Sequence, residues 1–97
     1  MDKKVEIKKP STAGTVESND ILIMLSKNEK NSIEIALESV VEKQYGSRIQ
    51  EVIQDTLKKE GVASAKVVAK DKGALDFTIR ARVKAALERS IGDNDEL

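Results

Sequence analysis

The chain has 97 residues, of which 39% are hydrophobic and 35% charged, and its 17 lysines and arginines balance 17 aspartates and glutamates. This length fits one small domain with one modest core, and the sequence holds no apolar run of about 18 residues that could form a transmembrane helix. Cysteine and histidine are absent, which removes disulfides, thiolate nucleophiles, the commonest general base and the commonest metal ligands, so we expect neither a metal site nor a self-contained enzyme.

The first segment, residues 1–12, is polar and rich in lysine, with Pro10 near its end. Val5 and Ile7 alternate with charged neighbours, which would suit a short edge strand, but the composition favours a flexible N-terminal arm. No apolar stretch follows Met1, so we expect no secretory signal. A small secreted domain without disulfides would be unusual, and for that reason we expect a cytoplasmic location.

Two apolar segments separated by a polar connection predict a pair of strands. Residues 21–25 read Ile-Leu-Ile-Met-Leu, which is typical of a strand covered on both faces, or nearly so. In residues 33–38, Ile33, Ile35 and Leu37 alternate with polar or small residues and indicate a half-buried strand. Because the connection is short, we expect these strands to pair as an antiparallel hairpin.

A long amphipathic helix is predicted after Ser39, which begins a capping-box sequence that ends at Glu42. The apolar residues that follow recur at helical spacing and would form one stripe. Gly61 is well placed to end this helix. The stripe consists of Val41, Tyr45, Ile49, Val52, Ile53, Thr56 and Leu57.

A third strand is predicted over residues 64–70, where alanine and valine alternate with lysine. Residues 71–73 read Asp-Lys-Gly, which is a turn signal.

The next segment, residues 75–83, fits the spacing of a strand and that of a helix. Its alanine, arginine and lysine content favours a helix over about 77–90, with Asp76 as a candidate N-cap and a short strand left open at 74–77. The acidic residues 92–97 are predicted to form a disordered tail.

The order of elements is therefore β-β-α-β-α, with a short fourth strand as an open alternative. An amphipathic helix and a sheet with one polar face bury their apolar sides against each other. We expect an α+β fold, a two-layer α/β sandwich with a mainly antiparallel sheet, as a single domain over residues 13–91.

One serine, Ser18, stands in a short polar loop just ahead of the first apolar run. The loop, residues 13–20, reads Ala-Gly-Thr-Val-Glu-Ser-Asn-Asp. Spacing alone indicates an ordinary turn, and with no base near it in sequence Ser18 is not an activated nucleophile. A serine that passively accepts a covalent group, however, needs only exposure and a flexible flank, which the small residues 13–15 supply.

Three blocks of sequence resemble the citrate lyase acyl carrier family, and they occur in the order and at the spacing of that family. They are residues 13–20, residues 37–46 (Leu-Glu-Ser-Val-Val-Glu-Lys-Gln-Tyr-Gly) and residues 71–83 (Asp-Lys-Gly-Ala-Leu-Asp-Phe-Thr-Ile-Arg-Ala-Arg-Val). With their connections they cover about residues 5–90. The resemblance implies a non-catalytic carrier, the gamma subunit of bacterial citrate lyase, and so an acyl carrier domain.

The resemblance also implies a covalent prosthetic group, 2'-(5''-phosphoribosyl)-3'-dephospho-coenzyme A, joined by a phosphodiester to the serine after Glu17, namely Ser18. Many family members have a second serine at the next position, where this chain has Asn19. The absence of cysteine is consistent with a thiol that belongs to the attached group.

The resemblance implies three partners. A holo-carrier synthase would attach the group. A CoA-transferase-type alpha subunit would then exchange acetyl for citryl on its thiol and release acetate, and a lyase beta subunit would cleave the citryl thioester to oxaloacetate and regenerate the acetyl thioester.

Positive charge gathers in the second predicted helix at Arg80, Arg82, Lys84 and Arg89, where only Glu88 opposes it. One interpretation is a solvated helix face, partly balanced by an ion pair between Lys84 and Glu88. The other is a docking patch for an acidic partner surface or for the phosphates of a cofactor.

Other functions remain as alternatives. The acyl carrier subunit of malonate decarboxylase is a close competitor by resemblance, since it has a related fold and the same type of cofactor. A cofactor-free interaction module would instead dock through the face formed by residues 80–89. Binding of nucleic acid is disfavoured because the net charge is zero and Tyr45 and Phe77 are the only aromatic residues.

Overall fold

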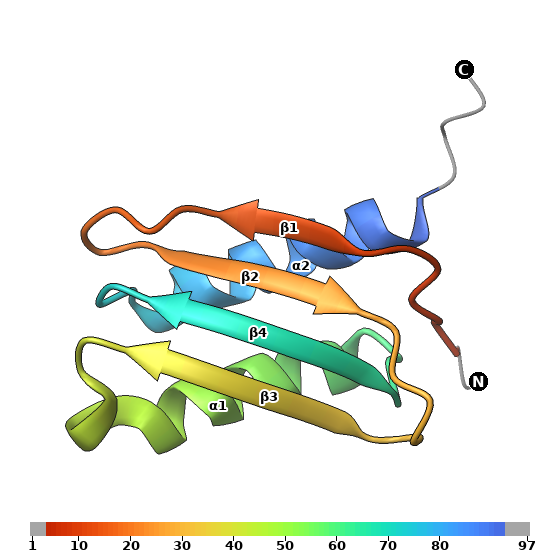
Figure 1. Cartoon of the computed structure of the whole chain (residues 1–97), viewed down its shortest axis with the longest axis horizontal. Coiled ribbons are helices and arrows are strands. Elements are labelled where there is room, and N and C mark those ends of the chain that lie inside the picture. The colour runs from red at the N-terminus through yellow and green to blue at the C-terminus, as the bar shows by residue number, and fades with distance from the viewer. Residues whose placement is uncertain (1–3, 93–97) are drawn as a thin grey trace.

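The computed structural model describes residues 4–92. Within them the chain forms one sheet, and both helices cover the same face of it, as Figure 1 shows. The predicted α+β two-layer architecture is confirmed, and the order β-β-β-α-β-α contains one strand more than expected. The elements are β1 (Ser11–Gly14), β2 (Ile21–Ser26), β3 (Ile33–Ser39), α1 (Glu42–Lys59), β4 (Ala65–Asp71) and α2 (Asp76–Ile91).

The strands lie in the order β1-β2-β4-β3. β1 pairs with β2 and β2 with β4 in antiparallel fashion, whereas β3 and β4 are parallel. The predicted hairpin between β2 and β3 is therefore wrong, because β4 lies between them. Helix α1 provides the crossover that a parallel pair needs, and the β2–β3 connection passes the start of β4, where Ser64 Oγ donates to the carbonyl oxygen of Asn28 at 2.7 Å.

The core lies between the sheet and the two helices. Alternate residues of β2 and β4 are buried, as expected for strands with one face on a core. Leu22 and Met24 point to the other face and are half-buried, so this second face of β2 is only partly covered. The largest side chains that are fully buried include Ile21, Ile23, Leu25, Ile53, Leu57, Ile79 and Val83.

Helix α1 begins without the predicted capping box. Ser39 is the last residue of β3, and its hydroxyl accepts a hydrogen bond from Val41 N at 3.0 Å and donates one to Asp71 Oδ2 at 2.7 Å. Within the predicted stripe, Tyr45 is 58% exposed. Gly46, which follows it outside the stripe, is buried close to Leu37. The helix ends at Lys59, just before Gly61, as predicted.

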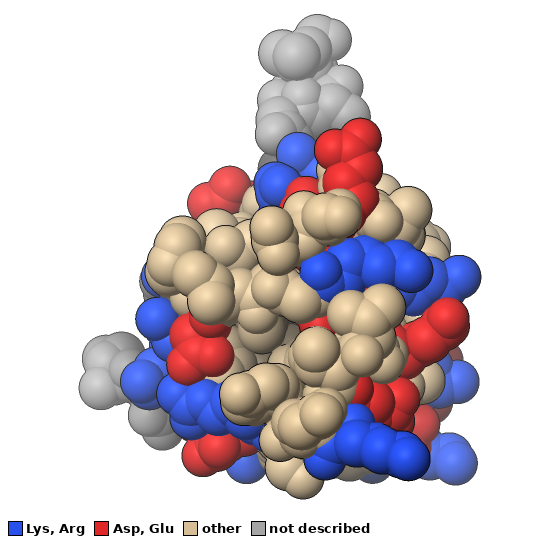
Figure 2. All heavy atoms as spheres, turned by 90° about the vertical axis from the view of Figure 1, so that its left-hand side faces the viewer, with Lys and Arg blue, Asp and Glu red and all other residues tan. Residues whose placement is uncertain are grey.

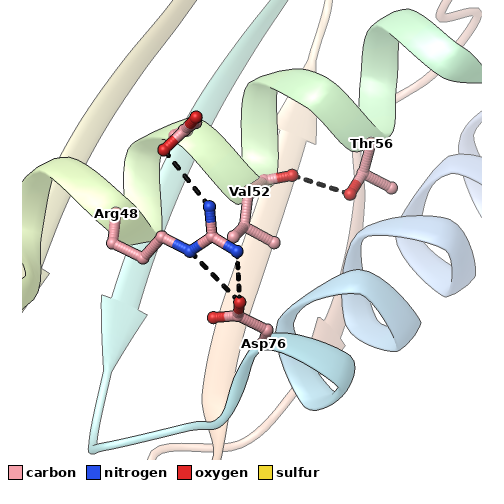
Figure 3. A network of polar contacts seen from close by, with 5 residues as sticks. Arg48, Val52, Thr56 and Asp76 are labelled. Carbon is pink, nitrogen blue, oxygen red and sulfur yellow. Dashed lines mark hydrogen bonds and ion pairs between the residues drawn. The ribbon is translucent and has the colours of Figure 1, made fainter.

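Helix α2 includes residues 76–83 of the segment whose spacing fitted both a strand and a helix. It starts at Asp76, and Leu75 is its N-cap residue, so Asp76 lies in the first turn and does not cap the helix. No strand forms at residues 74–77. Figure 3 shows what Asp76 does instead: its carboxylate accepts from Arg48 Nη2 at 2.6 Å and joins the starts of α1 and α2.

The described part of the predicted N-terminal arm is held against the domain. Val5 N donates to the carbonyl oxygen of Gly61 at 3.0 Å, and Ile7 is 3% exposed. Further along, Ser11 and Thr12 belong to β1. The apolar side chains of Val5 and Ile7 account for this packing, because they can join a core that the polar composition of the segment does not reveal.

The predicted acidic tail falls almost entirely outside the described residues. Of residues 92–97, only Gly92 is described. Neither α1 nor α2, the helices of the described chain, has the length and apolar character that crossing a membrane would require.

Candidate functional site

Ser18 is exposed in the loop that joins β1 to β2. It lies in a tight turn in which Asp20 N donates to the carbonyl oxygen of Glu17 at 3.1 Å. Asn19, the third residue of this turn, has a φ of 67°, a left-handed conformation that asparagine tolerates better than most residues. The turn therefore leaves the Ser18 side chain accessible from solvent.

The second half of this turn is fixed to the loop that follows β4. Asn19 N donates to the carbonyl oxygen of Lys72 at 2.8 Å, and Lys72 N donates to the carbonyl oxygen of Asp20 at 2.9 Å. Inside the loop, Thr15 Oγ1 accepts from Glu17 N at 3.1 Å and donates to Asp20 Oδ2 at 2.8 Å. The loop is thus held to a second loop, rather than being the flexible flank that the sequence predicted.

Arg82 of α2 anchors the same turn through a bidentate ion pair. Its Nε and Nη2 donate to Asp20 Oδ1 and Oδ2 at 2.9 and 2.7 Å. The hydrogen bond from Arg82 is the main cause that lowers the pKa of Asp20 to about 2. Hydrogen bonds from Thr15 and from Ile21 N act in the same direction, and burial opposes them in part. The Asp20 side chain is only 14% exposed, so solvent screens this pair less than an ordinary surface pair.

The change Asp20→Asn is expected to lower the free energy of unfolding at pH 7 by about 1–2 kcal/mol. Because the pKa of Asp20 lies below its ordinary value of 3.8 in the folded chain, its contribution is fully present above about pH 4 and is lost as the pH falls towards 2. Urea unfolding of both proteins at pH 7, 4 and 2.5 measures this. A difference between them that stays constant over that range would contradict the assignment.

The loop after β4 is itself organised by a buried carboxylate. Asp71 is 1% exposed. Its Oδ2 accepts from Ser39 Oγ at 2.7 Å and from Gly73 N at 3.0 Å, and its Oδ1 accepts from Ala74 N at 3.0 Å. Each oxygen therefore has a donor, as a buried carboxylate requires. Asp71 fixes the backbone on which the Ser18 turn rests.

Exposed apolar side chains gather at the end of the molecule that holds Ser18. They come from the β1–β2 loop, from the β3–α1 and β4–α2 connections, and from the first turns of both helices. In Figure 2, which faces this end, uncharged surface occupies the centre and charged residues lie around it. Both aromatic residues of the chain are among these side chains, which are Val16, Val40, Tyr45, Leu75 and Phe77, each at least 51% exposed.

The four basic residues predicted as one docking patch lie on two sides of α2. Arg80 and Lys84 line a groove between α2 and α1. Lys84 Nζ is 4.0 Å from Glu60 Oε2, and no pair with Glu88 forms within the described chain. Arg82 and Arg89 contact the first two strands and their loop, Arg89 Nη1 donating to the carbonyl oxygen of Thr12 at 2.7 Å. The structure therefore does not bring the four together as one surface.

The residues that hold the Ser18 turn were not identified from the sequence. Asp20 and Arg82 are 62 positions apart, and Ser39 and Asp71 are 32 apart. The sequence did contain a signal that could have indicated these pairs. Each pair joins two of the three sequence blocks that carry the family resemblance. The blocks meet at one end of the fold, around the exposed serine.

Comparisons with known proteins show which family this chain is similar to. A family model described as "Malonate decarboxylase delta subunit (MdcD)" matches residues 8–90. Among curated proteins, the citrate lyase acyl carrier protein of Lactobacillus helveticus (strain DPC 4571) is 53% identical over 92 residues, covering 95% of this chain and 94% of that protein. The protein of the same name from Streptococcus pyogenes serotype M5 (strain Manfredo) is 48% identical over 88 residues, or 91% and 86% of the two chains.

The fold also occurs in a solved structure. One chain of a Pseudomonas malonate decarboxylase hetero-tetramer in complex with malonate superposes with a TM-score of 0.76 and 20% sequence identity, covering 95% of this chain and 93% of that chain. A likeness at this level of identity establishes the fold.

Proposed function

Because this chain belongs to the citrate lyase acyl carrier protein family and is thus a non-catalytic carrier subunit, we propose that Ser18 bears the prosthetic group on which it carries acyl groups. The group that we propose is 2'-(5''-phosphoribosyl)-3'-dephospho-coenzyme A, attached through a phosphodiester to Ser18 Oγ. When bound, it supplies the thiol that the chain itself lacks.

The observation that supports this assignment most strongly is the setting of Ser18. The turn backbone is bonded on both sides of the serine, at Glu17 and Asn19, while Ser18 itself is exposed. A fixed base with an exposed serine suits a long attached arm, because a partner enzyme can reach the side chain to attach the group.

Several other hydroxyl groups are less suited to accept the group. The hydroxyls of several serines donate to groups within the domain, and Thr15 Oγ1 is held between Asp20 and Glu17. A phosphodiester at any of these positions would break an internal hydrogen bond. The serines engaged in this way are Ser11, Ser39, Ser64 and Ser90.

The partners that we propose are the alpha and beta subunits of citrate lyase and a holo-carrier synthase. The carrier would present its acyl group first to the alpha subunit and then to the beta subunit, so that citrate is cleaved to acetate and oxaloacetate. The exposed apolar side chains around Ser18 support contact with partner proteins at this end, because aromatic residues are enriched at protein interfaces. Tethering keeps the acyl group at a high local concentration for both sites.

A carrier subunit of malonate decarboxylase is the second candidate. The description of the matching family model and the fold of the solved structure favour it. The relatives at 48–53% identity carry the citrate lyase name, and for that reason citrate lyase remains the first choice.

Reconstitution distinguishes the two candidates. The loaded chain is combined with citrate lyase alpha and beta subunits in one assay, and with the other malonate decarboxylase subunits in a second. We expect cleavage of citrate at the rate given by the cognate citrate lyase carrier, and malonate decarboxylation no faster than without a carrier. The reverse result would assign the chain to malonate decarboxylase.

A further inference from the structure

A shallow hollow of about 340 Å³ lies beside the Ser18 turn, and we call it the lysine hollow. The turn meets it directly, since Val16 belongs to the same loop as Ser18 and the backbone of Lys72 bonds to Asn19 and Asp20. A group attached to Ser18 therefore starts at the border of this hollow. The residues that line it are Val16, Glu38, Ser39, Val40, Lys70, Asp71 and Lys72.

The charges that the lysine hollow presents to solvent are mainly positive. Lys70 and Lys72 are exposed, and neither forms an ion pair with any residue from 4 to 92. The carboxylate of Asp71 is buried and already accepts hydrogen bonds from Ser39, Gly73 and Ala74. Glu38 lies opposite Lys70 across the two parallel strands and is the one acidic side chain exposed here. Two free ammonium groups beside a serine favour a phosphorylated ligand.

The lysine hollow also has apolar walls. Val16 is 51% exposed and Val40 is 63% exposed, although both are large hydrophobic residues. Small-molecule sites combine apolar contact surface with a few polar groups that fix the ligand's orientation. Here the two valines supply the apolar part of a lining that is otherwise polar or charged. The combination suits a nucleotide, whose phosphates would face the lysines while its sugar and base cover the valines.

We propose that the lysine hollow seats the root of the attached group, meaning the phosphodiester at Ser18 and the phosphoribosyl and nucleotide portion that follows it. This inference rests on the proposed function. Lys72 and Lys70 pair with the phosphates, and Val16 and Val40 contact the ribose and base. With its root seated, only the outer part of the arm moves freely, which shortens the effective tether and raises the local concentration of its thiol end.

The test compares the loaded carrier, isolated in active form, with the same chain without the attached group, and reads backbone amide signals by NMR. We expect the attached group to shift the amides of Val16, Val40, Lys70 and Lys72. Because the attraction is electrostatic and exposed, raising KCl from about 50 to about 500 mM should reduce the shift at Val40 by at least half. Intact mass, measured on the same sample, reports whether the group is present.

Charge-neutral variants identify the groups responsible. The double change Lys70→Gln and Lys72→Gln should reduce the shift at Val40 more than twofold. The matched control is Lys66→Gln. Lys66 lies on the same face of β4 as Lys70, and its neighbour in the register of β3 and β4 is Glu34. This change should leave the shift at Val40 unchanged. A loaded carrier whose changes are confined to residues 17–19 would overturn the seating and leave the proposed function intact, whereas an active carrier without added mass would overturn both.

Discussion

Ser18→Ala is expected to reduce citrate cleavage to the level of a preparation without any carrier. The substitution removes the only atom through which the proposed group is attached, and the chain has no cysteine that could supply another thiol. The mass added by a host that loads the carrier should disappear in the same variant. The assay measures oxaloacetate formation after the variant replaces the wild-type carrier in the assembled lyase.

The matched control is Ser47→Ala, since Ser47 is exposed on α1 and not in the Ser18 loop. Both substitutions should change the free energy of unfolding by less than about 0.5 kcal/mol, as is usual for exposed positions. Ser47→Ala should retain full activity and full added mass. Citrate cleavage at the wild-type rate by Ser18→Ala would show that Ser18 is not the attachment point.

Gly14→Ala is expected to have the largest effect on stability. Gly14 ends β1 with a φ of 95°, and a Cβ atom there would lie 1.8 Å from the carbonyl oxygen of Ile21. Backbone strain of about 1–2 kcal/mol adds to a steric cost of about 1–3 kcal/mol. The sum, about 2–5 kcal/mol, is a large part of the about 5–15 kcal/mol that stabilises an ordinary domain. Urea unfolding at pH 7 measures it.

Gly73→Ala separates the steric effect from the backbone strain. Gly73 has nearly the same φ, 94°, but a Cβ atom there would meet only Asn19 Oδ1 at 3.7 Å, which is ordinary contact. Only the strain of about 1–2 kcal/mol should remain. If Gly14→Ala were no more destabilising than Gly73→Ala, the close approach between Gly14 and Ile21 would not be a constraint on this fold.

The elements that were predicted correctly, such as α1 and β4, are those whose sequence pattern lies within the element itself. The apolar spacing within α1 predicted the helix, and Gly61 after it predicted where the helix ends. The alternation of β4 gave that strand. By contrast, β1 was not predicted, because its four residues, Ser11–Gly14, are small and include no large apolar side chain. Ala13 is buried only because β2 lies beside it, so pairing rather than propensity makes this segment a strand.

Long-range partners account for the remaining differences. Ser39 looked like a helix cap, but its hydroxyl donates to Asp71 from the neighbouring strand. The β2–β3 hairpin failed because the short connection reaches across the start of β4, an arrangement that loop length alone does not reveal. At the candidate site, Ser18 came from family resemblance, whereas Asp20, Arg82 and Lys72 became visible only when the fold brought distant segments together.

The central claim is that Ser18 carries the covalent group, and mass spectrometry of the carrier taken from an active citrate lyase complex tests it most directly. Intact mass should exceed the encoded mass by one phosphoribosyl-dephospho-coenzyme A group. Fragmentation of the tryptic peptide that ends at Lys27 should place the added mass on Ser18 and not on Ser26. A fully active complex whose carrier has only its encoded mass, or carries the group on another residue, would contradict the account.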